Sequence, residues 1–392
     1  MMQWSQLLRR YLRRIPPGSG NFTQDLDKFL PGNKLTLLNT GGEAFASMWE
    51  AMESARHTIH LETYIFYSDE TGQEFADRLM AKARQGVSVR LIFDSIGSME
   101  MDPLFLTRLR NAGVRVLEYH PVAPWRSNWA WSNRDHRKIL VVDSRVAFTG
   151  GMNISHDHAP RQLGGGDWYD THVKVEGPAA YELDRLFRAV WFKESKKWFP
   201  LLDYPDQTPG TSLVWVAANQ EILHRHRIRS AYINALRAAR REVLIANAYF
   251  IPDRGIRLAL AAAARRGVAV KILVPGISEF SFVWHAGRRR FSQLLREGVR
   301  IFEWPGSILH AKTAVIDGVW CAVGSYNMDH RSLLHNLEVN VKILDCDLAD
   351  QMKTRFERDL ASSREITYEK WRDRPWMDKQ REKFWYLFRY FF

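Results

Sequence analysis

An internal repeat constrains this chain more than any other feature of its sequence. The stretch from His136 to Asp143 returns as the stretch from His310 to Asp317, at an offset of 174 residues. The same offset relates a lysine, a glycine and an asparagine in each half, namely Lys138 and Lys312, Gly150 and Gly324, and Asn153 and Asn327. Because chance agreement at so many polar and glycine positions is not expected, the sequence predicts two halves of similar structure.

A strand–helix–strand pattern precedes the repeated stretch in each half. In the first half, apolar runs at 58–66 and 87–93 flank a helical stretch that ends at Gln85-Gly86. In the second half, runs at 243–250 and 268–274 flank a helix at 256–266. A glycine after a helix and a short apolar run are typical of a helix end and a buried strand. We therefore expect an α/β fold with mixed, largely parallel sheets flanked by helices.

The histidine and lysine of each repeated stretch are two residues apart, as in His136 and Lys138. Residues i and i+2 of a strand point to the same face, so these side chains project together, and so do His310 and Lys312. Lysine supplies a fixed positive charge, and histidine can exchange a proton or attack near neutral pH. The pair indicates a site for an anion that undergoes chemistry.

A turn follows each of these strands. With a two-residue loop, the first turn pairs Asp143 with Val146 and sets Asn153 directly opposite His136. The equivalent residues in the second half are Asp317, Trp320, Asn327 and His310. Each half would then present a histidine, a lysine and an asparagine to one point, which suits a phosphodiester.

Acidic residues accompany the pair in each half. Asp143 and Asp317 belong to the catalytic motif, but they stand at the first position of a turn, where aspartate often bonds the local backbone. We favour a structural and electrostatic role for them over proton transfer. A nucleophilic histidine also needs an orienting carboxylate. Asp170 and Glu338 occupy equivalent strand positions downstream and are the candidates, with a plain surface acid as the alternative.

Composition narrows the class of protein further. A chain of 392 residues with 46% hydrophobic and 26% charged residues is expected to fold. The net charge of +12 indicates an acidic partner, and both nucleic acid and anionic lipid fit. Two cysteines, Cys321 and Cys346, exclude a disulfide framework. Neither a transmembrane run nor a signal peptide is evident, which favours a cytosolic protein or one bound to the cytosolic face of a membrane.

The sequence divides into five segments. Residues 1–32 form a basic amphipathic segment, and residues 361–392 form an aromatic and basic tail. The predicted halves are 33–192 and 213–360, joined by a junction at 193–212. Each end suits either the interface of a membrane or a docked position on the protein body, and both alternatives stay open.

The paired H-x-K-x4-D motifs, each followed by a glycine and then an asparagine, resemble the phospholipase D superfamily. Within it, residues 33–371 look like a bacterial cardiolipin synthase of the short type without N-terminal transmembrane spans. The resemblance implies two phospholipase D-like lobes related by pseudo-twofold symmetry, with the active site at their interface. It also implies exchange through a phosphohistidine without a metal or other cofactor. His136 would be the nucleophile and His310 the acid and base. The residues holding the phosphoryl oxygens would be Lys138, Lys312, Asn153 and Asn327.

These observations favour a phosphatidyltransferase. We expect a cardiolipin synthase that transfers a phosphatidyl group from one phosphatidylglycerol, or a similar phospholipid, to the glycerol hydroxyl of another. Anionic phospholipid and the cytoplasmic surface of the cell membrane are the expected partners, and nucleic acid is not. The alternatives are a hydrolase with the same site, either a lipase or a nuclease, and a binding module with a disused site. The sequence leaves open whether the acceptor is phosphatidylglycerol, phosphatidylethanolamine or glycerol, and leaves protein partners open.

Overall fold

The computed structural model describes residues 14–126, 129–161, 164–204, 208–219 and 226–391. Residues 1–13 of the predicted amphipathic segment lie outside this part. Two compact units are present. The first consists of Leu30–Val216 together with Asn336–Val339, and the second contains Ala217–His335 and Asn340–Phe392 as well as residues 14–29. The chain passes between units at Val216, a few residues after the predicted junction at 193–212.

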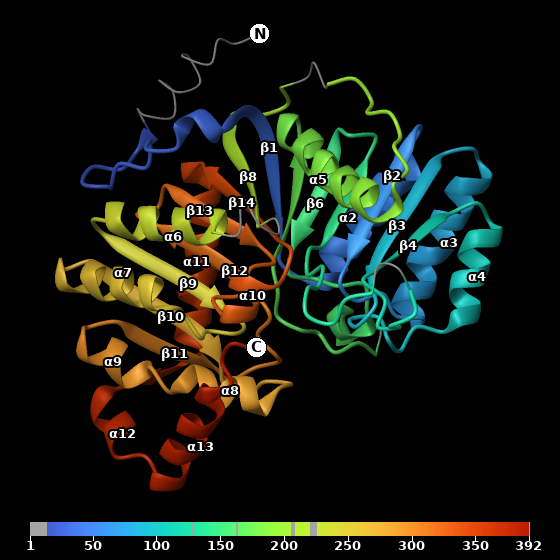
Figure 1. The fold of residues 1–392 in the computed structure, drawn as a ribbon. Coiled ribbons are helices and arrows are strands. Elements are labelled where there is room, and N and C mark those ends of the chain that lie inside the picture. The colour runs from blue at the N-terminus through green and yellow to red at the C-terminus, as the bar shows by residue number, and fades with distance from the viewer. Residues whose placement is uncertain (1–13, 127–128, 162–163, 205–207, 220–225, 392) are drawn as a thin grey trace. The chain divides into compact units, whose positions relative to one another are not determined.

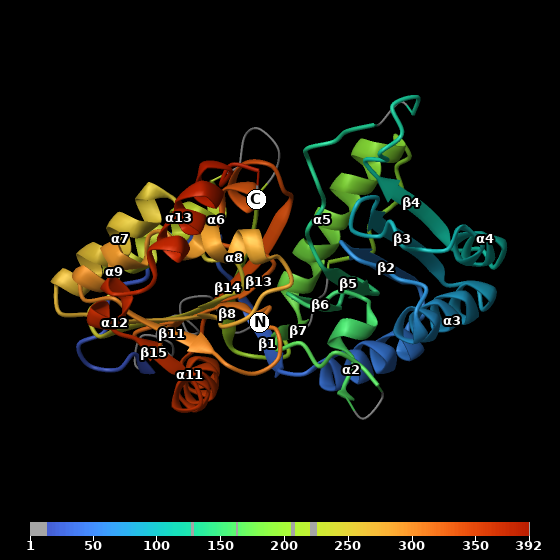
Figure 2. The same ribbon diagram turned by 90° about the horizontal axis from the view of Figure 1, so that it is seen from below.

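The first unit is built on a mixed sheet with strand order β1-β7-β6-β5-β2-β3-β4 (Figure 1). Its strands are β1 (Leu30–Leu38), β2 (Thr58–Thr63), β3 (Ser88–Asp94), β4 (Arg115–Tyr119), β5 (Ile139–Val142), β6 (Val146–Gly150) and β7 (His172–Glu176). Its α-helices are α2 (Gly41–Ser54), α3 (Glu70–Arg84), α4 (Pro103–Asn111) and α5 (Pro178–Ser195). Helix α5 covers one face of the sheet, while α2, α3 and α4 cover the other (Figure 2). Two short 3₁₀ turns, η1 (Leu26–Lys28) and η2 (His156–His158), also lie in the N-terminal half of the chain.

The second unit repeats this plan with strand order β15-β11-β10-β9-β12-β13-β14. Its strands are β9 (Glu242–Asn247), β10 (Ala269–Pro275), β11 (Arg300–Trp304), β12 (Lys312–Ile316), β13 (Trp320–Gly324), β14 (Glu338–Leu344) and β15 (Arg364–Ile366). The first two residues of β14 belong to the first unit. Its helices are α6 (Arg227–Ala238), α7 (Arg254–Arg265), α8 (Ser281–Arg288), α9 (Phe291–Arg296), α10 (His330–Leu334), α11 (Cys346–Ala361), α12 (Tyr368–Arg372) and α13 (Trp376–Leu387). Strand β8 (Ser212–Asn219) begins in the first unit, where it pairs antiparallel with β1, and its last residues belong to the second.

Apolar side chains explain why these elements pack as they do. In the first unit, Phe45 of α2, Phe75 of α3 and Phe105 of α4 are almost fully buried against one face of the sheet. Phe187 and Trp191 of α5 are buried against the other face. Burying large side chains on both faces of the sheet supplies most of the stability of such a unit.

The predicted strand–helix–strand pattern is confirmed in both units, but the proportion of parallel strands is corrected. Parallel pairs join β2 to β3 to β4 in the first unit, and β9 to β10 to β11 in the second. The remaining pairs within the two sheets are antiparallel. The sheets are therefore mixed but largely antiparallel, because the motif strands connect through tight hairpins that need no crossover helix.

The register of the two motif hairpins differs by one residue from the prediction. Val142 pairs with Val146, and the equivalent pair in the second unit is Ile316 and Trp320. Asp143 therefore lies inside the turn, in the left-handed region with a φ of +50°, rather than in a strand pair. The Asp143 carboxylate accepts hydrogen bonds from the backbone ahead of β2, which draws this residue out of the ladder.

This shift overturns the predicted position of the asparagines. With Val142 opposite Val146, continuing the ladder would set Met152, not Asn153, opposite His136. In the second unit, the same shift would set Tyr326, not Asn327, opposite His310. The ladders end at Ile139–Thr149 and Thr313–Val323, so the predicted pairing of each asparagine with its histidine across the hairpin is not found.

The predicted C-terminal tail is folded as part of the second unit. Its β15 pairs antiparallel with β11, and its α13 packs against α8. Both thiols are free, with Cys321 buried and Cys346 half-buried. None of the helices in the described part of the chain combines the length and the apolar character that crossing a bilayer requires.

Candidate active site

His136 lies on an extended segment that leads into β5, and a carboxylate from a distant part of the sequence holds its ring. Asn336–Val339 joins the first unit, where the backbone N–H of His136 donates to the carbonyl of Leu337 over 3.0 Å. The next residue, Glu338, is fully buried and has both carboxylate oxygens 3.1 Å from Nδ1 of His136. When Nδ1–H donates to this carboxylate, Nε2 carries the lone pair that a nucleophile needs.

The motif lysines turn back onto their own histidines. Lys138 is buried, and its Nζ donates to the carbonyl of His136 over 2.7 Å. Lys312 in β12 is also buried and donates in the same way to the carbonyl of His310. Each unit therefore holds an ammonium group against the backbone carbonyl of its motif histidine. That the two side chains project together toward a ligand stays a prediction.

An aromatic ring completes each half-site. Tyr64, just after β2, lies edge-on to His136 with ring centroids 5.1 Å apart, and Lys138 Nζ lies 5.3 Å from the Tyr64 centroid. Tyr249, just after β9, lies edge-on to His310 at 6.4 Å. Sequence reasoning missed both tyrosines. The signal was present, because the two tyrosines follow equivalent strands, β2 and β9, within matching aromatic stretches.

Asp143 and Asp317 anchor the motif turns. The Asp143 carboxylate accepts the backbone N–H groups of Arg56, His57 and Thr58 at 2.7–2.9 Å. Asp317 accepts four backbone N–H groups at 2.7–2.9 Å, from Gly20, Arg240, Arg241 and Glu242. These contacts fix the strand end opposite to the histidine and match the structural role favoured above.

The asparagines and Asp170 have distinct local partners. Asn153 Oδ1 accepts the backbone N–H of Ile65 at 3.3 Å. Asn327 is buried, and its Oδ1 accepts no hydrogen bond from the described residues. Asp170 is buried with Oδ2 3.5 Å from Nε2 of His158. Their convergence on a phosphoryl group therefore stays a prediction.

A further matched pair supports the loops after β6 and β13. His172 of β7 accepts the backbone N–H of Met152 at Nδ1 over 3.3 Å. Asn340 of β14 accepts the backbone N–H of Tyr326 over 3.2 Å. Burial lowers the pKa of His172 to about 3, so its imidazole stays neutral and can accept this bond.

A buried ionic network flanks His136 in the first unit. Arg137 contacts Glu62 at 2.7 Å and Asp135 at 3.2 Å, and the backbone N–H of Asp135 donates to Asp94 at 2.8 Å. Burial by itself would lower the pKa of Arg137, but the two carboxylates raise it overall. Burial raises the pKa of Asp94 to about 6. The second half has Ala311 at the position of Arg137, so this network distinguishes the two half-sites.

In the first unit, a carboxylate holds a histidine that has a lysine and a tyrosine beside it, and this α/β unit occurs twice. The combination defines a phosphodiester-exchanging class of enzyme. Comparisons with known proteins agree. The family model described as "Cardiolipin synthase, PLD-like domain" matches residues 48–191 and 232–360. A cardiolipin synthase of Geobacillus sp. (strain WCH70) is 35% identical over 86% of this chain and 68% of its own length. The major cardiolipin synthase of Bacillus subtilis (strain 168) is 31% identical over 88% and 73%.

Solved structures agree on the fold. The phosphatidylserine synthase of Haemophilus influenzae matches with a TM-score of 0.69 at 14% identity, over 98% of this chain and 99% of that one. The polyphosphate kinase of Porphyromonas gingivalis matches with a TM-score of 0.59 at 16% identity, over 86% of this chain and 49% of that one. The chain therefore belongs to the PLD-like cardiolipin synthase family of the phospholipase D superfamily. The family is one of phosphatidyltransferases, and the expectation of an enzyme of this class is confirmed.

Proposed function

We propose that this protein is a cardiolipin synthase that moves a phosphatidyl group from one phosphatidylglycerol to the glycerol hydroxyl of another. The observation that carries the proposal is the Glu338 carboxylate 3.1 Å from Nδ1 of His136, which prepares a nucleophilic imidazole. The relatives described as cardiolipin synthases support the choice of substrate.

In the first step, Nε2 of His136 attacks the phosphorus of phosphatidylglycerol. The N–P bond forms as the bond from phosphorus to the glycerol oxygen breaks, and the protonated His310 gives its proton to that oxygen. Glycerol leaves, and a phosphatidyl group stays on His136. Glu338 stabilises the positive charge that develops on the imidazole.

In the second step, His310 takes the proton of a hydroxyl group on a second phosphatidylglycerol. The resulting oxygen attacks phosphorus, the N–P bond breaks, and cardiolipin leaves with both histidines restored. The ammonium groups of Lys138 and Lys312, with the amides of Asn153 and Asn327, hold the phosphoryl oxygens as charge builds. In this proposal Asp170 orients His310 as Glu338 orients His136, because the two acids are equivalent in the repeat.

The site of action in this proposal is the cytoplasmic surface of the cell membrane, reached as a peripheral protein. The net charge of +12 supports attraction to a leaflet rich in anionic phospholipid. Each cationic residue near such a surface contributes about 1 kcal/mol, so a few of them suffice for binding.

Incubation of the purified protein with phosphatidylglycerol vesicles tests the proposal. We expect equimolar glycerol and cardiolipin, and a phosphorus-labelled protein after acid-free quenching. His136→Gln removes the label and turnover, whereas the exposed His57→Gln leaves both intact. Phosphatidic acid without cardiolipin would instead identify a hydrolase. Adding phosphatidylethanolamine or glycerol as competing acceptors identifies the second substrate.

A further inference from the structure

A row of aromatic side chains in the second unit runs from the motif histidine to the exposed face of α13. Tyr249, which lies edge-on to His310, contacts Phe280 with ring centroids 6.3 Å apart. Phe280 contacts Phe282 at 5.7 Å, and Phe282 contacts Trp385 of α13 at 5.7 Å. Tyr249, Phe282 and Trp385 are half-buried against a small hydrophobic cluster, and Phe280 is exposed. The row therefore keeps part of each ring at the surface, where the rings together make an apolar path.

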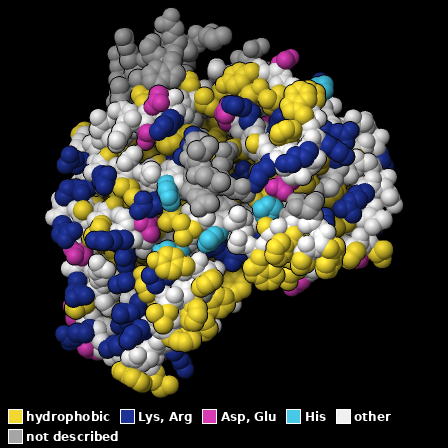
Figure 3. All heavy atoms as spheres, viewed as in Figure 1, with side chains coloured by type: hydrophobic (Ala, Val, Ile, Leu, Met, Phe, Trp, Pro, Cys, Tyr) yellow, Lys and Arg dark blue, Asp and Glu magenta, His cyan; other side chains and the backbone are white. Residues whose placement is uncertain are grey.

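The path ends in large exposed side chains on α13 and just beyond it. Phe384 is 52% exposed, Leu387 is 64% exposed and Phe391 is 74% exposed. Helical spacing places Phe384 and Leu387 on one side, whereas Tyr386 and Glu382 are buried on the other. Figure 3 shows hydrophobic side chains gathered over the α8 and α13 part of the molecule, with Lys and Arg side chains on the surface beside them. An exposed patch of this kind marks an interaction site.

Cations accompany these apolar residues. Lys383 and Arg381 of α13 are exposed, and Arg389 lies over the ring of Tyr386 at 4.6 Å. Of the two acids on α13, Glu382 is buried against Arg374 and therefore adds little negative charge to the outer face. Aromatic and basic side chains together are typical of a surface that enters the headgroup layer of an anionic membrane.

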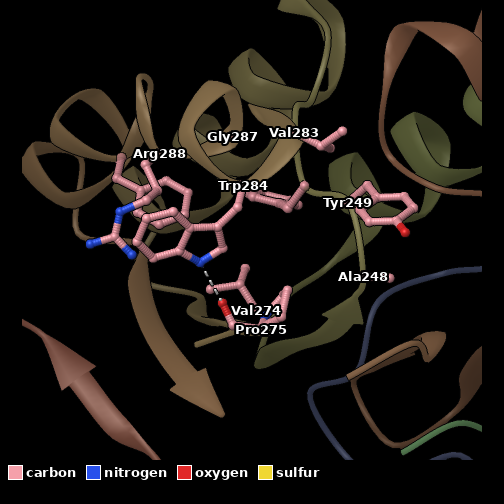
Figure 4. A pocket seen from close by; sticks show the side chains of 10 residues that line it. Ala248, Tyr249, Val274, Pro275, Val283, Trp284, Gly287 and Arg288 are labelled. Atoms are coloured by element: carbon pink, nitrogen blue, oxygen red, sulfur yellow. Dashed lines mark hydrogen bonds between the residues drawn. The ribbon is translucent and has the colours of Figure 1, made fainter. Parts of the chain in front are cut away.

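A pocket beneath α8 extends the apolar surface beside this row. Trp284 and Arg288 of α8 form one side, Tyr249 forms the other, and Val274 and Pro275 lie at the end of β10 (Figure 4). The indole N–H of Trp284 donates to the carbonyl of Pro275 over 3.1 Å, which fixes this wall. Tyr249 thus belongs both to the pocket and to the row that reaches α13.

We propose that the outer face of α13 docks on a bilayer of anionic phospholipid, and that the row Tyr249–Phe280–Phe282–Trp385 carries the acyl chains of a substrate toward His310. This inference rests on the proposed function, since it takes phosphatidylglycerol as the substrate. A membrane explains the features together: the apolar tip, the flanking cations and a path that leads to a reactive histidine. A docked protein or a second copy of the chain would require no such path.

The test pairs vesicle binding with turnover of a short-chain substrate. The double variant Phe384→Asp with Leu387→Asp is expected to bind phosphatidylglycerol vesicles roughly tenfold or more weakly. It is expected to keep the wild-type rate on dihexanoyl phosphatidylglycerol below its micelle concentration. Leu258→Asp is the matched control, because Leu258 is 46% exposed on α7 of the same unit and should leave vesicle binding unchanged.

Three outcomes would overturn the inference. Wild-type vesicle binding by the double variant would exclude α13 as the docking face. If the wild type bound phosphatidylcholine vesicles as tightly as phosphatidylglycerol vesicles, the cations would have no role in docking. A change of oligomeric state with unchanged vesicle binding would identify a second copy as the occupant. Failure of the proposed function looks different, since the wild type would then bind phosphatidylglycerol vesicles without making cardiolipin.

The path itself is tested by Phe282→Ala. Removal of this ring interrupts the row between Phe280 and Trp385. We expect KM for long-chain phosphatidylglycerol in vesicles to rise several-fold, with kcat and the short-chain KM unchanged. An equal loss with both substrates would show that Phe282 only supports the fold and would overturn the path.

Discussion

Glu338 holds Nδ1 of His136 from 202 positions away in the sequence, with both carboxylate oxygens at 3.1 Å. The contact lies within the first unit, although Glu338 follows the second motif along the chain. A short stretch of the second half, Asn336–Val339, is thus built into the first unit. The two halves of the repeat are therefore not independent, because a carboxylate that follows one motif contacts the histidine of the other.

Replacement of this acid should mainly lower kcat. Glu338→Gln keeps the size of the side chain but loses the charge that stabilises a developing imidazolium and fixes the Nδ1–H tautomer. We expect kcat for cardiolipin formation to fall by roughly 10²-fold or more, with KM within about threefold. The matched control is Glu357→Gln on α11, whose side chain is 51% exposed. A Glu338→Gln enzyme within twofold of the wild type would contradict an orienting role.

The ring of Tyr64 should support catalysis through packing. Tyr64→Leu removes the edge contact to His136 and the ring near the Lys138 ammonium, and we expect kcat to fall about tenfold. Tyr64→Phe retains the ring and should stay within about threefold. Tyr181→Leu is the control. Tyr181 lies on α5, outside the candidate site, and its ring contacts Tyr204. Equal losses in the Phe and Leu variants would assign the effect to the hydroxyl group instead.

The sequence was sufficient to predict the repeated strand–helix–strand units. The spacing of hydrophobic residues and the glycines that end helices are local signals, which can be read without knowing the fold. The i and i+2 spacing of Lys138 and His136 is also a local signal, and Lys138 bonds the backbone carbonyl of His136. The sequence could not show which histidine Glu338 contacts. The equivalence of Glu338 and Asp170 in the repeat identifies the type of residue, but it does not identify the histidine that each acid contacts. The predicted hairpin register is wrong by one residue, because the Asp143 carboxylate bonds a backbone segment more than eighty positions earlier. Long-range contacts of this kind leave no periodic trace in the sequence.

Asp143 should matter for stability more than for chemistry. Asp143→Ala leaves three backbone N–H groups ahead of β2 without their charged acceptor. We expect the free energy of unfolding to fall by about 2–3 kcal/mol in urea denaturation. The folded variant should keep kcat within about tenfold of the wild type.

The control for Asp143 is Asp77→Ala on α3. This side chain is 63% exposed and pairs with Arg108 at 3.6 Å, so the expected change is below about 0.5 kcal/mol. Unchanged stability of Asp143→Ala with a thousandfold loss of kcat would instead assign this residue to proton transfer.

His172 should make the fold sensitive to acid, and the second unit suggests the variant that removes this sensitivity. Burial lowers the pKa of His172 to about 3, whereas the unfolded chain binds a proton at this residue near pH 6.5. Between these values only the unfolded state is protonated, so stability is complete above pH 6.5 and falls as the pH decreases. The slope is about 1.4 kcal/mol per pH unit. His172→Asn introduces the residue found at the equivalent Asn340, which accepts the same kind of backbone hydrogen bond without titrating.

Urea denaturation at pH 7.5, 6.5, 5.5 and 4.5 measures this difference. Between pH 6.5 and 4.5, the wild type is expected to lose about 2–3 kcal/mol more stability than His172→Asn, while the two curves run parallel above pH 7. The exposed His57→Asn should follow the wild type throughout, because this side chain lies at the surface and not in the core. Parallel curves for wild type and His172→Asn down to pH 4.5 would mean that His172 accepts protons in the folded protein. The hydrogen bond from the Met152 backbone would then be lost as the pH falls below 6.5, since a protonated Nδ1 cannot accept it.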